Sequence, residues 1–133
     1  MFTDSEIELV RTTWEKASAD PEAAARLFYG KLFETAPAVK PLFTSDMTEQ
    51  GRKLMQMIGV AVNNMDRLEE IVPALIEMGK RHDEYGAQPE HYPVVGEVLI
   101  DTLSTALGDE FSEEAEQAWS KTYSALASTM LSR

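Results

Sequence analysis

The chain has 133 residues, of which 44% are apolar and 26% are charged, and its formal net charge is −11. This length suits a single domain over residues 1–133 and excludes two ordinary ones. The absence of cysteine excludes disulfides and thiolate metal sites, and the acidic balance disfavours nucleic acid or an anionic membrane surface as a partner.

Hydrophobic spacing predicts helices throughout the first half of the chain. Apolar residues recur every three or four positions over residues 4–17. Asp20 and Pro21 are typical of a helix N-cap and first turn, so a second helix is expected from there to about residue 35. Pro37 ends it, and we expect a short third helix ending near residue 43 and a polar turn over residues 44–47. Residues 48–65 are predicted to form a long, strongly apolar helix.

The second half of the chain continues the helical pattern. Residues 68–84 are predicted to form a helix in which Pro73 is tolerated near the start or marks a kink. Gly86 is placed to end this helix in left-handed geometry, and Pro89 opens the next one, which runs to Leu107. A last helix follows Ser112. The prediction is an all-α fold of six to seven crossed helices.

Nothing in the sequence points to export or to a membrane. No uninterrupted apolar stretch approaches the length needed to cross a bilayer. Residues 1–6 carry acids and lack a basic segment followed by an apolar run. We therefore expect a cytoplasmic protein.

The two histidines of the chain lie in different settings. His82 follows Leu75, Met78 and Gly79 at intervals of seven, four and three, so it shares their apolar helix face and is expected to point inward. An inward histidine is either a hydrogen-bonded core residue or an axial ligand of a haem iron, and periodicity alone favours the core residue. His91 begins the next helix, where a capping or surface role is expected.

Two further polar residues lie among apolar ones. Tyr29 belongs to an aromatic-rich helix, where its hydroxyl would bond either to a carbonyl or to a bound ligand. Gln50 shares a helix face with Leu54 and adds an amide donor beside an apolar wall. Glycine-rich phosphate loops, paired metalloprotease histidines, nucleophile elbows and Glu-x-x-His di-iron motifs are all missing from the sequence.

Four segments carry a resemblance to a known family: LFYGKLF at 27–33, PLF at 41–43, EQGRKL at 49–54, and KRH at 80–82 followed by PEHYPVVGE at 89–97. Together they resemble the bacterial single-domain globins, including the group likened to neuroglobin, and the globin domain of flavohaemoglobins, over nearly the whole chain. The last segment is the most specific. The resemblance implies a globin fold around a haem pocket, with haem b as the cofactor and His82 as the iron ligand.

The resemblance also implies roles for other residues. His82 would bind iron through one ring nitrogen while the other N–H donates to a backbone carbonyl. Tyr29 and Gln50 would donate hydrogen bonds to dioxygen on the opposite side, where Leu54 limits the space. Lys53 or Arg81 could pair with a haem propionate, although Lys53 could equally be solvated. The other residues expected at the cofactor are Phe33, Leu42, Phe43 stacked on the porphyrin, Ala87, Tyr92, Val95 and Tyr123, the last of which could equally be a core residue.

The resemblance implies reversible binding of dioxygen, NO or CO, in a monomer or a homodimer. Nitric oxide dioxygenation would need an external reductase, because no reductase domain is seen in the sequence. Flavohaemoglobins place a glutamate late in the last helix beside the tyrosine matched by Tyr92. Aligned from Trp119, that position falls just beyond residue 133, so weaker activation of oxygen is expected. Gas sensing and a haem-free helical interaction module of globin fold are the alternative functions.

Overall fold

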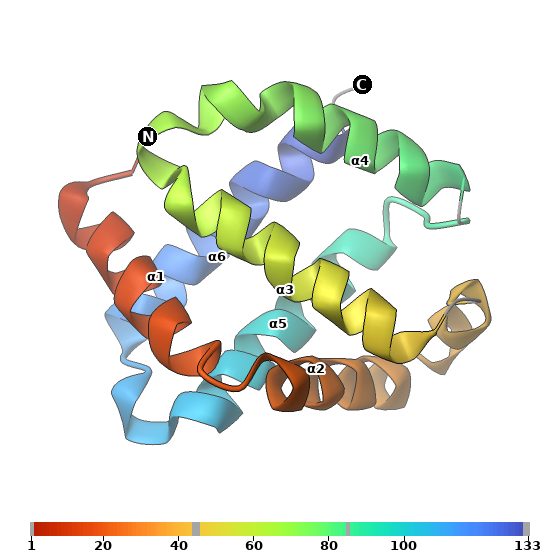
Figure 1. Cartoon of the computed structure of the whole chain (residues 1–133), viewed down its shortest axis with the longest axis horizontal. Helices are drawn as coiled ribbons and strands as arrows, with labels where there is room; N and C mark the ends of the chain where they lie inside the picture. The colour runs from red at the N-terminus through yellow and green to blue at the C-terminus, as the bar shows by residue number, and fades with distance from the viewer. Residues whose placement is uncertain (1, 44–45, 85, 132–133) are drawn as a thin grey trace.

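The computed structural model describes residues 2–43, 46–84 and 86–131, which fold into six α-helices and three short 3-10 helices with no strand in these ranges (Figure 1). The α-helices are α1 (Asp4–Ala17), α2 (Pro21–Thr35), α3 (Met47–Asn63), α4 (Val72–Glu84), α5 (His91–Leu107) and α6 (Glu113–Leu131). The 3-10 helices are η1 (Pro37–Leu42), η2 (Met65–Ile71) and η3 (Gly108–Glu110). The predicted all-α fold is confirmed. No helix in the described ranges is long and apolar enough to cross a bilayer.

Short polar side chains fix where several helices begin. Thr3 and Glu6 form a reciprocal capping box at α1, with the Thr3 hydroxyl 3.1 Å from the Glu6 amide and the Glu6 carboxylate 2.8 Å from the Thr3 amide. The Asp20 carboxylate accepts from the Ala23 amide at the start of α2, as the sequence predicted. Asp46 does the same for α3. Each cap contributes about 1 kcal/mol to the stability of its helix.

The helix predicted over residues 68–84 begins later than expected, at Val72. The chain first passes through η2, where Arg67 leaves helical geometry at φ −152° and ψ 51°. Pro73 is consequently the second residue of α4, a position that tolerates proline. Of the polar turn predicted over residues 44–47, Thr44 and Ser45 lie outside the described residues, and Met47 already belongs to α3.

Helix α3 ends at Asn63, before the end of the helix predicted over residues 48–65, and a side chain from α1 caps it. The Arg11 guanidinium on α1 donates to the carbonyls of Val62 and Asn63, at 3.2 and 3.1 Å, and pairs with Asp66 at 3.2 Å. Carbonyls in the last turn of a helix lack the amides of a following turn, and here the arginine supplies donors to two of them. The arginine therefore ties α1 to the junction between α3 and η2.

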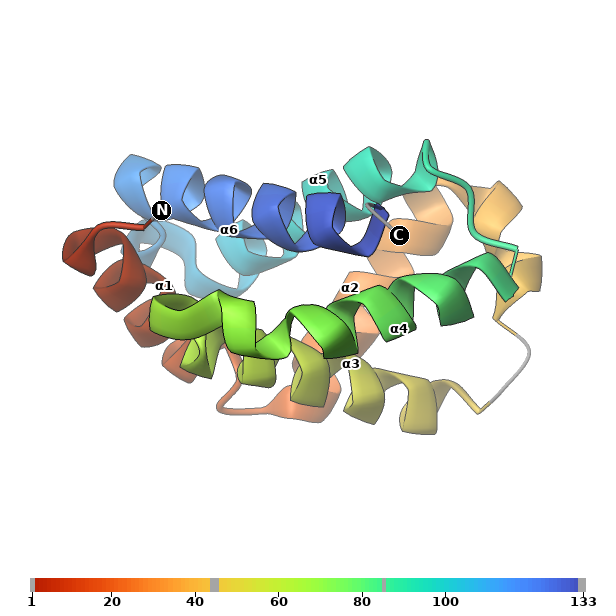
Figure 2. The ribbon, with the colours of Figure 1, turned by 90° about the horizontal axis from the view of Figure 1, so that it is seen from above.

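The core lies where α1, α2, α5 and α6 cross, and Trp119 is its largest fully buried side chain. Trp119 is 1% exposed, packs with its ring centroid 5.9 Å from that of Trp14, and donates its indole N–H to the Thr13 hydroxyl at 2.8 Å. Burying this indole is favourable only because its polar atom keeps a partner. Seen from above, α5 and α6 lie on one side of the molecule and α3 and α4 on the other (Figure 2).

The separation of α3 from α4 positions the candidate site. Within the described ranges, α3 packs on α1 and α2, whereas α4 packs on α6 and η2. Figures 1 and 2 show α3 and α4 diverging from η2, so that the first turn of α3 and the last turn of α4 lie at the open end. Gln50 belongs to the first of these turns and His82 to the second.

Candidate cofactor and ligand site

His82 lies in the last turn of α4 and is half-buried, and its Nδ1 lies 2.8 Å from the carbonyl oxygen of Met78, four residues earlier. A carbonyl oxygen can only accept a hydrogen bond, so Nδ1 carries the ring proton when the imidazole is neutral. The lone pair is then on Nε2, at the far side of the ring from the helix backbone. This is the tautomer in which a histidine binds a metal ion through Nε2.

The turn after His82 brings the chain back towards this histidine. Ala87, which is half-buried, donates its amide to the His82 carbonyl at 3.0 Å. Gly86 takes φ +93°, a left-handed conformation that glycine adopts without strain. The role predicted for Gly86 at the end of α4 is confirmed, and it lets the chain enter α5 at His91 within a few residues.

Tyr92 and Tyr123 lie together beside His82. Tyr92, in the first turn of α5, is 6% exposed, and its ring centroid is 6.3 Å from that of His82. The Tyr123 hydroxyl, on α6, donates to the Tyr92 carbonyl oxygen at 2.6 Å. Burial raises the pKa of Tyr123 well above its usual value, so this hydroxyl keeps its proton.

Tyr29 and Gln50 meet across the contact between α2 and α3. Tyr29 is 7% exposed, and its hydroxyl lies near enough to the Gln50 side chain for that amide to lower the Tyr29 pKa. Burial raises the pKa of Tyr29 to about 12, because the phenolate would lose hydration, and the Gln50 side chain offsets part of this rise. Tyr29 therefore remains an O–H donor at neutral pH. The structure brings this predicted pair together.

An aromatic cluster extends from Tyr29 towards η1. The ring centroid of Phe43 lies 5.5 Å from that of Tyr29 and 5.3 Å from that of Phe33, both in edge-to-face geometry. Phe33 and Phe43 are half-buried, and so is Leu42 beside them. The Lys40 ammonium lies 5.8 Å from the Phe33 ring centre. This cluster is a broad apolar wall with one cation at its edge.

The remaining predicted residues divide between the interior and the rim. Leu54 on α3 and Val95 on α5 are half-buried and pack against the core. Lys53 and Arg81 are exposed, and neither forms an ion pair within the part of the chain that the structure describes. They are therefore available to pair with an anionic group at the edge of the site.

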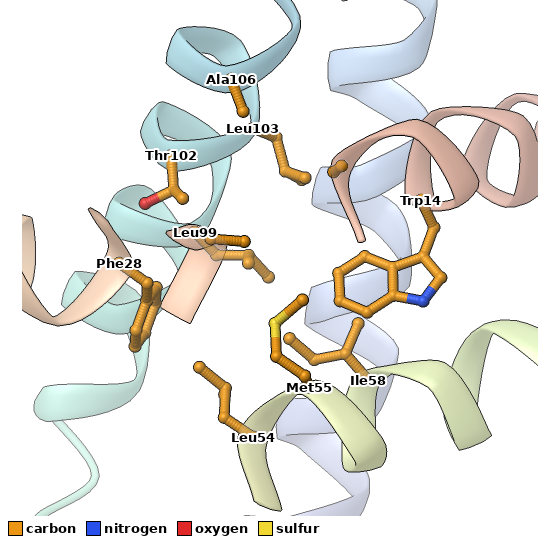
Figure 3. Close-up of a pocket in the computed structure, with 11 residues that line it drawn as sticks. Trp14, Phe28, Leu54, Met55, Ile58, Leu99, Thr102, Leu103 and Ala106 are labelled. Atoms are coloured by element: carbon orange, nitrogen blue, oxygen red, sulfur yellow. The ribbon is translucent and has the colours of Figure 1, made fainter. Parts of the chain in front are cut away.

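A small apolar cavity lies between α1, α2, α3 and α5 (Figure 3). Its volume is about 20 Å³, and one of its lining residues, Phe28, packs edge-on against Tyr29 with the ring centroids 5.1 Å apart. The hydroxyl of Thr102, which also lines it, is already bonded to the Val98 carbonyl at 2.8 Å. A cavity of this size holds about one water-sized molecule and has no room for a porphyrin.

The chemistry of the residues at the open end of α3 and α4 fits a haem. A histidine with its lone pair on Nε2 is a suitable iron ligand, and half-buried aromatic side chains suit a flat apolar ring. The Tyr29–Gln50 pair supplies two polar groups for a small ligand, and exposed cations at the rim suit the carboxylates of the ring. In the described ranges no cluster of three or more His, Asp or Glu residues could hold a metal ion.

Gly51 on α3 lets this helix approach α2 closely, and these are the two helices that carry Gln50 and Tyr29. A Cβ at Gly51 would lie 2.9 Å from the Cβ of Ala25 on α2, closer than real carbon contacts allow. Sequence analysis missed this glycine and also Gly96 on α5. The signal that could have identified them is the position of each glycine in the interior of a predicted helix.

Replacing Gly51 with alanine is expected to destabilise the protein by about 1–3 kcal/mol, because the backbone of α3 must move away from α2. The matched control is Gly30→Ala on α2, where a Cβ would meet no atom within 4 Å. That variant should gain up to about 1 kcal/mol from its higher helix propensity. Urea unfolding of both variants measures the difference. Equal effects of the same sign would show that the two helices are not in tight contact at Gly51.

Comparisons with known proteins give consistent results. A family model described as Globin matches residues 26–130. A flavohemoprotein from Bacillus subtilis is 29% identical over 136 residues, covering 98% of this chain and 34% of that protein. Neuroglobin-1 from Oncorhynchus mykiss is 28% identical over 143 residues, covering 97% of this chain and 90% of that protein. The chain thus spans about a third of the length of the flavohemoproteins that it matches.

Solved structures extend the similarity to three dimensions. An engineered carbene transferase from Rhodothermus marinus superposes with a TM-score of 0.88 and 26% identity, over 99% of this chain and 92% of that one. A bacterial globin from Campylobacter jejuni superposes with a TM-score of 0.85 and 26% identity, over 98% of this chain and 94% of that one.

Proposed function

This chain belongs to the globin family, and we propose that it binds haem b through His82 and reversibly binds dioxygen, as well as NO and CO. The observation that carries the proposal is the position of His82 at the open end of α4, with Gln50 at the open end of α3 and Tyr29 beside it on α2. When bound, the haem supplies an iron atom with a coordination position for a diatomic gas and a one-electron redox couple.

On the proximal side, which is the side of His82, this histidine would bind the haem iron through Nε2 while the Met78 carbonyl accepts a hydrogen bond from its Nδ1–H. This hydrogen bond fixes the tautomer of the ring, and it makes Nε2 a better electron donor. The apolar wall of Phe33, Leu42 and Phe43 excludes water from the ring face, and Ala87 and Val95 line the proximal side. Lys53 and Arg81 would pair with the two propionate carboxylates of the haem at the solvent edge of the site.

On the distal side, Tyr29 and Gln50 act on the gas. The Tyr29 hydroxyl and the Gln50 side-chain amide would donate hydrogen bonds to a diatomic ligand that carries partial negative charge. The two side chains lie close together, Tyr29 being almost fully buried, so both donors are near one ligand position. Leu54 restricts the space beside them. Slow release of dioxygen is the consequence.

The solved structure from Rhodothermus marinus with which this chain superposes is described as a putative nitric oxide dioxygenase, which supports NO dioxygenation as a further activity. Flavohemoproteins from Bacillus subtilis and Vibrio cholerae match this chain over about a third of their own length. We propose that the globin converts NO and dioxygen to nitrate and that a reductase is its partner, which returns the oxidised iron to the ferrous state. The single-domain organisation over residues 1–133, the cytoplasmic location and the monomeric or homodimeric state remain predictions.

The test of this activity is NO consumption by the oxygenated ferrous protein. A single mixing with NO should yield about one nitrate per haem and leave the iron ferric, and turnover should continue only when a reductase and its electron donor are supplied. Absorption spectra and nitrate assay measure both. Dioxygen binding without nitrate formation would confine the function to oxygen binding or sensing. Failure of the protein to change the spectrum of added haem would favour a haem-free interaction module.

A further inference from the structure

Tyr123 was expected only to line the site, but it also forms a hydrogen bond to the backbone of α5 close to His82. Its hydroxyl, on α6, donates to the backbone carbonyl of Tyr92, the second residue of α5, at 2.6 Å. This oxygen lies in the first turn of α5, where it also faces the amide of Gly96 four residues later. A side chain of α6 thus bonds directly to the backbone at the start of α5.

Gly96 is what allows this hydrogen bond to form. A Cβ at Gly96 would lie 2.7 Å from Cε2 and 2.8 Å from Cδ2 of Tyr123, so the ring rests on bare helix backbone. The hydroxyl passes over this position to reach the carbonyl one turn earlier. Glycine in a helix interior costs about 1 kcal/mol relative to alanine. The close contact with Tyr123 accounts for a glycine at this site.

The helix that Tyr123 holds also carries a neighbour of His82. The Tyr92 ring is almost fully buried, and its centroid lies 6.3 Å from that of His82 at an interplanar angle of 42°. Within the described ranges, α4 and α5 each pack on α6, and α5 is not among the main partners of α4. Helix α6 is therefore the common support that relates the two rings to each other.

We propose that Tyr123 is a positioning residue: its hydrogen bond to the Tyr92 carbonyl, made possible by Gly96, fixes Tyr92 against His82 and so sets the orientation of the His82 ring. This inference rests on the proposed role of His82 as the haem ligand. Its geometric part, the coupling of α6 to the His82 ring through α5, exists in the chain itself and can be tested without haem.

The first test is nuclear magnetic resonance on the haem-free protein. Tyr123→Phe keeps the ring and removes the hydroxyl, and it should speed amide hydrogen exchange in the first turn of α5 about fivefold, as expected for the loss of one neutral hydrogen bond. It should also shift the ring resonances of His82. The matched control is Thr122→Val, which removes a buried hydroxyl that bonds within α6, to the Ala118 carbonyl at 2.7 Å. That variant should lose similar overall stability and leave the His82 resonances unchanged.

Gly96→Ala provides a second, independent variant, because its Cβ displaces the Tyr123 ring. It should reproduce the His82 shifts of Tyr123→Phe, and the double variant should show less than the sum of the two effects, since both break the same contact. In the haem-loaded protein, Tyr123→Phe should shift the iron–histidine stretching frequency and Thr122→Val should not. His82 resonances that respond equally to Tyr123→Phe and Thr122→Val would overturn the proposal. Failure of the chain without substitutions to bind haem would instead refute the proposed function.

Discussion

Replacing His82 with alanine is expected to weaken haem binding by more than about 100-fold and to remove the Soret band of a histidine-ligated haem, because no other ligand replaces Nε2. The Nδ1–H of His82 already bonds to the Met78 carbonyl, so the ring has only its other nitrogen with which to bind iron. Titration of the purified variant with ferric haem, followed by absorption spectra, measures the loss.

His91→Ala is the matched control for this experiment. His91 begins α5, and its Nδ1 accepts a hydrogen bond from the Gln88 amide at 3.0 Å, which is a local contact of the turn. Its loss should leave the haem spectrum intact. Added imidazole should restore the Soret band of the His82→Ala variant, which distinguishes a missing ligand from a misfolded protein. An unchanged spectrum in His82→Ala without imidazole would show that another residue binds the iron.

Removing the distal donors is the second change with a large expected effect. Tyr29→Phe and Gln50→Leu should each speed dioxygen dissociation by roughly 10- to 100-fold, because a hydrogen bond to a charged partner contributes about 1.5–3 kcal/mol. The double variant should show less than the product of the two factors, since both donors act on the same ligand. Stopped-flow displacement of dioxygen by CO measures the rates.

Carbon monoxide serves as the internal control for the distal pair. CO gains less negative charge than dioxygen, so its dissociation rate should change much less in the same variants. A similar change for both gases would indicate that the substitutions act through the space in the pocket. Dioxygen dissociation that is unchanged in both single variants would contradict the role proposed for Tyr29 and Gln50.

Most of the helical architecture was predictable from sequence, because apolar periodicity and local caps determine it. The helix over residues 4–17 begins and ends where apolar periodicity predicted, and the helix over residues 21–35 where its cap and the prolines predicted. The start of α4 was not predictable. Its delay to Val72 depends on η2 and on Arg11, which bonds to the carbonyl of Val62 across 51 positions of sequence. A periodic pattern contains no information on such a distant cap.

The candidate site shows a similar division. The residue types that could serve a haem were visible as an inward histidine and two polar residues in apolar helices, and the family resemblance assigned their roles. Their mutual placement was not visible. The contacts of Gly51 with Ala25 and of Gly96 with Tyr123 depend on where helices cross, and crossing points follow from packing in three dimensions. An interior glycine marks such a point without identifying its partner.

The proximal and distal sides of the site rest on different supports. On the proximal side, the backbone of α4 holds the His82 ring, and a hydrogen bond from α6 holds the start of α5 beside it. On the distal side, the close contact of α2 with α3 brings Tyr29 to Gln50. Changes to one side should therefore alter one class of property, either iron electronics or ligand release, more than the other.

The most direct test of the central claim is the titration of the unaltered haem-free protein with haem, followed by reduction and exposure to dioxygen. The account predicts saturation at about one haem per chain with a Soret band, and a change of spectrum with dioxygen that reverses when the gas is removed. A protein that leaves the spectrum of added haem unchanged would contradict it.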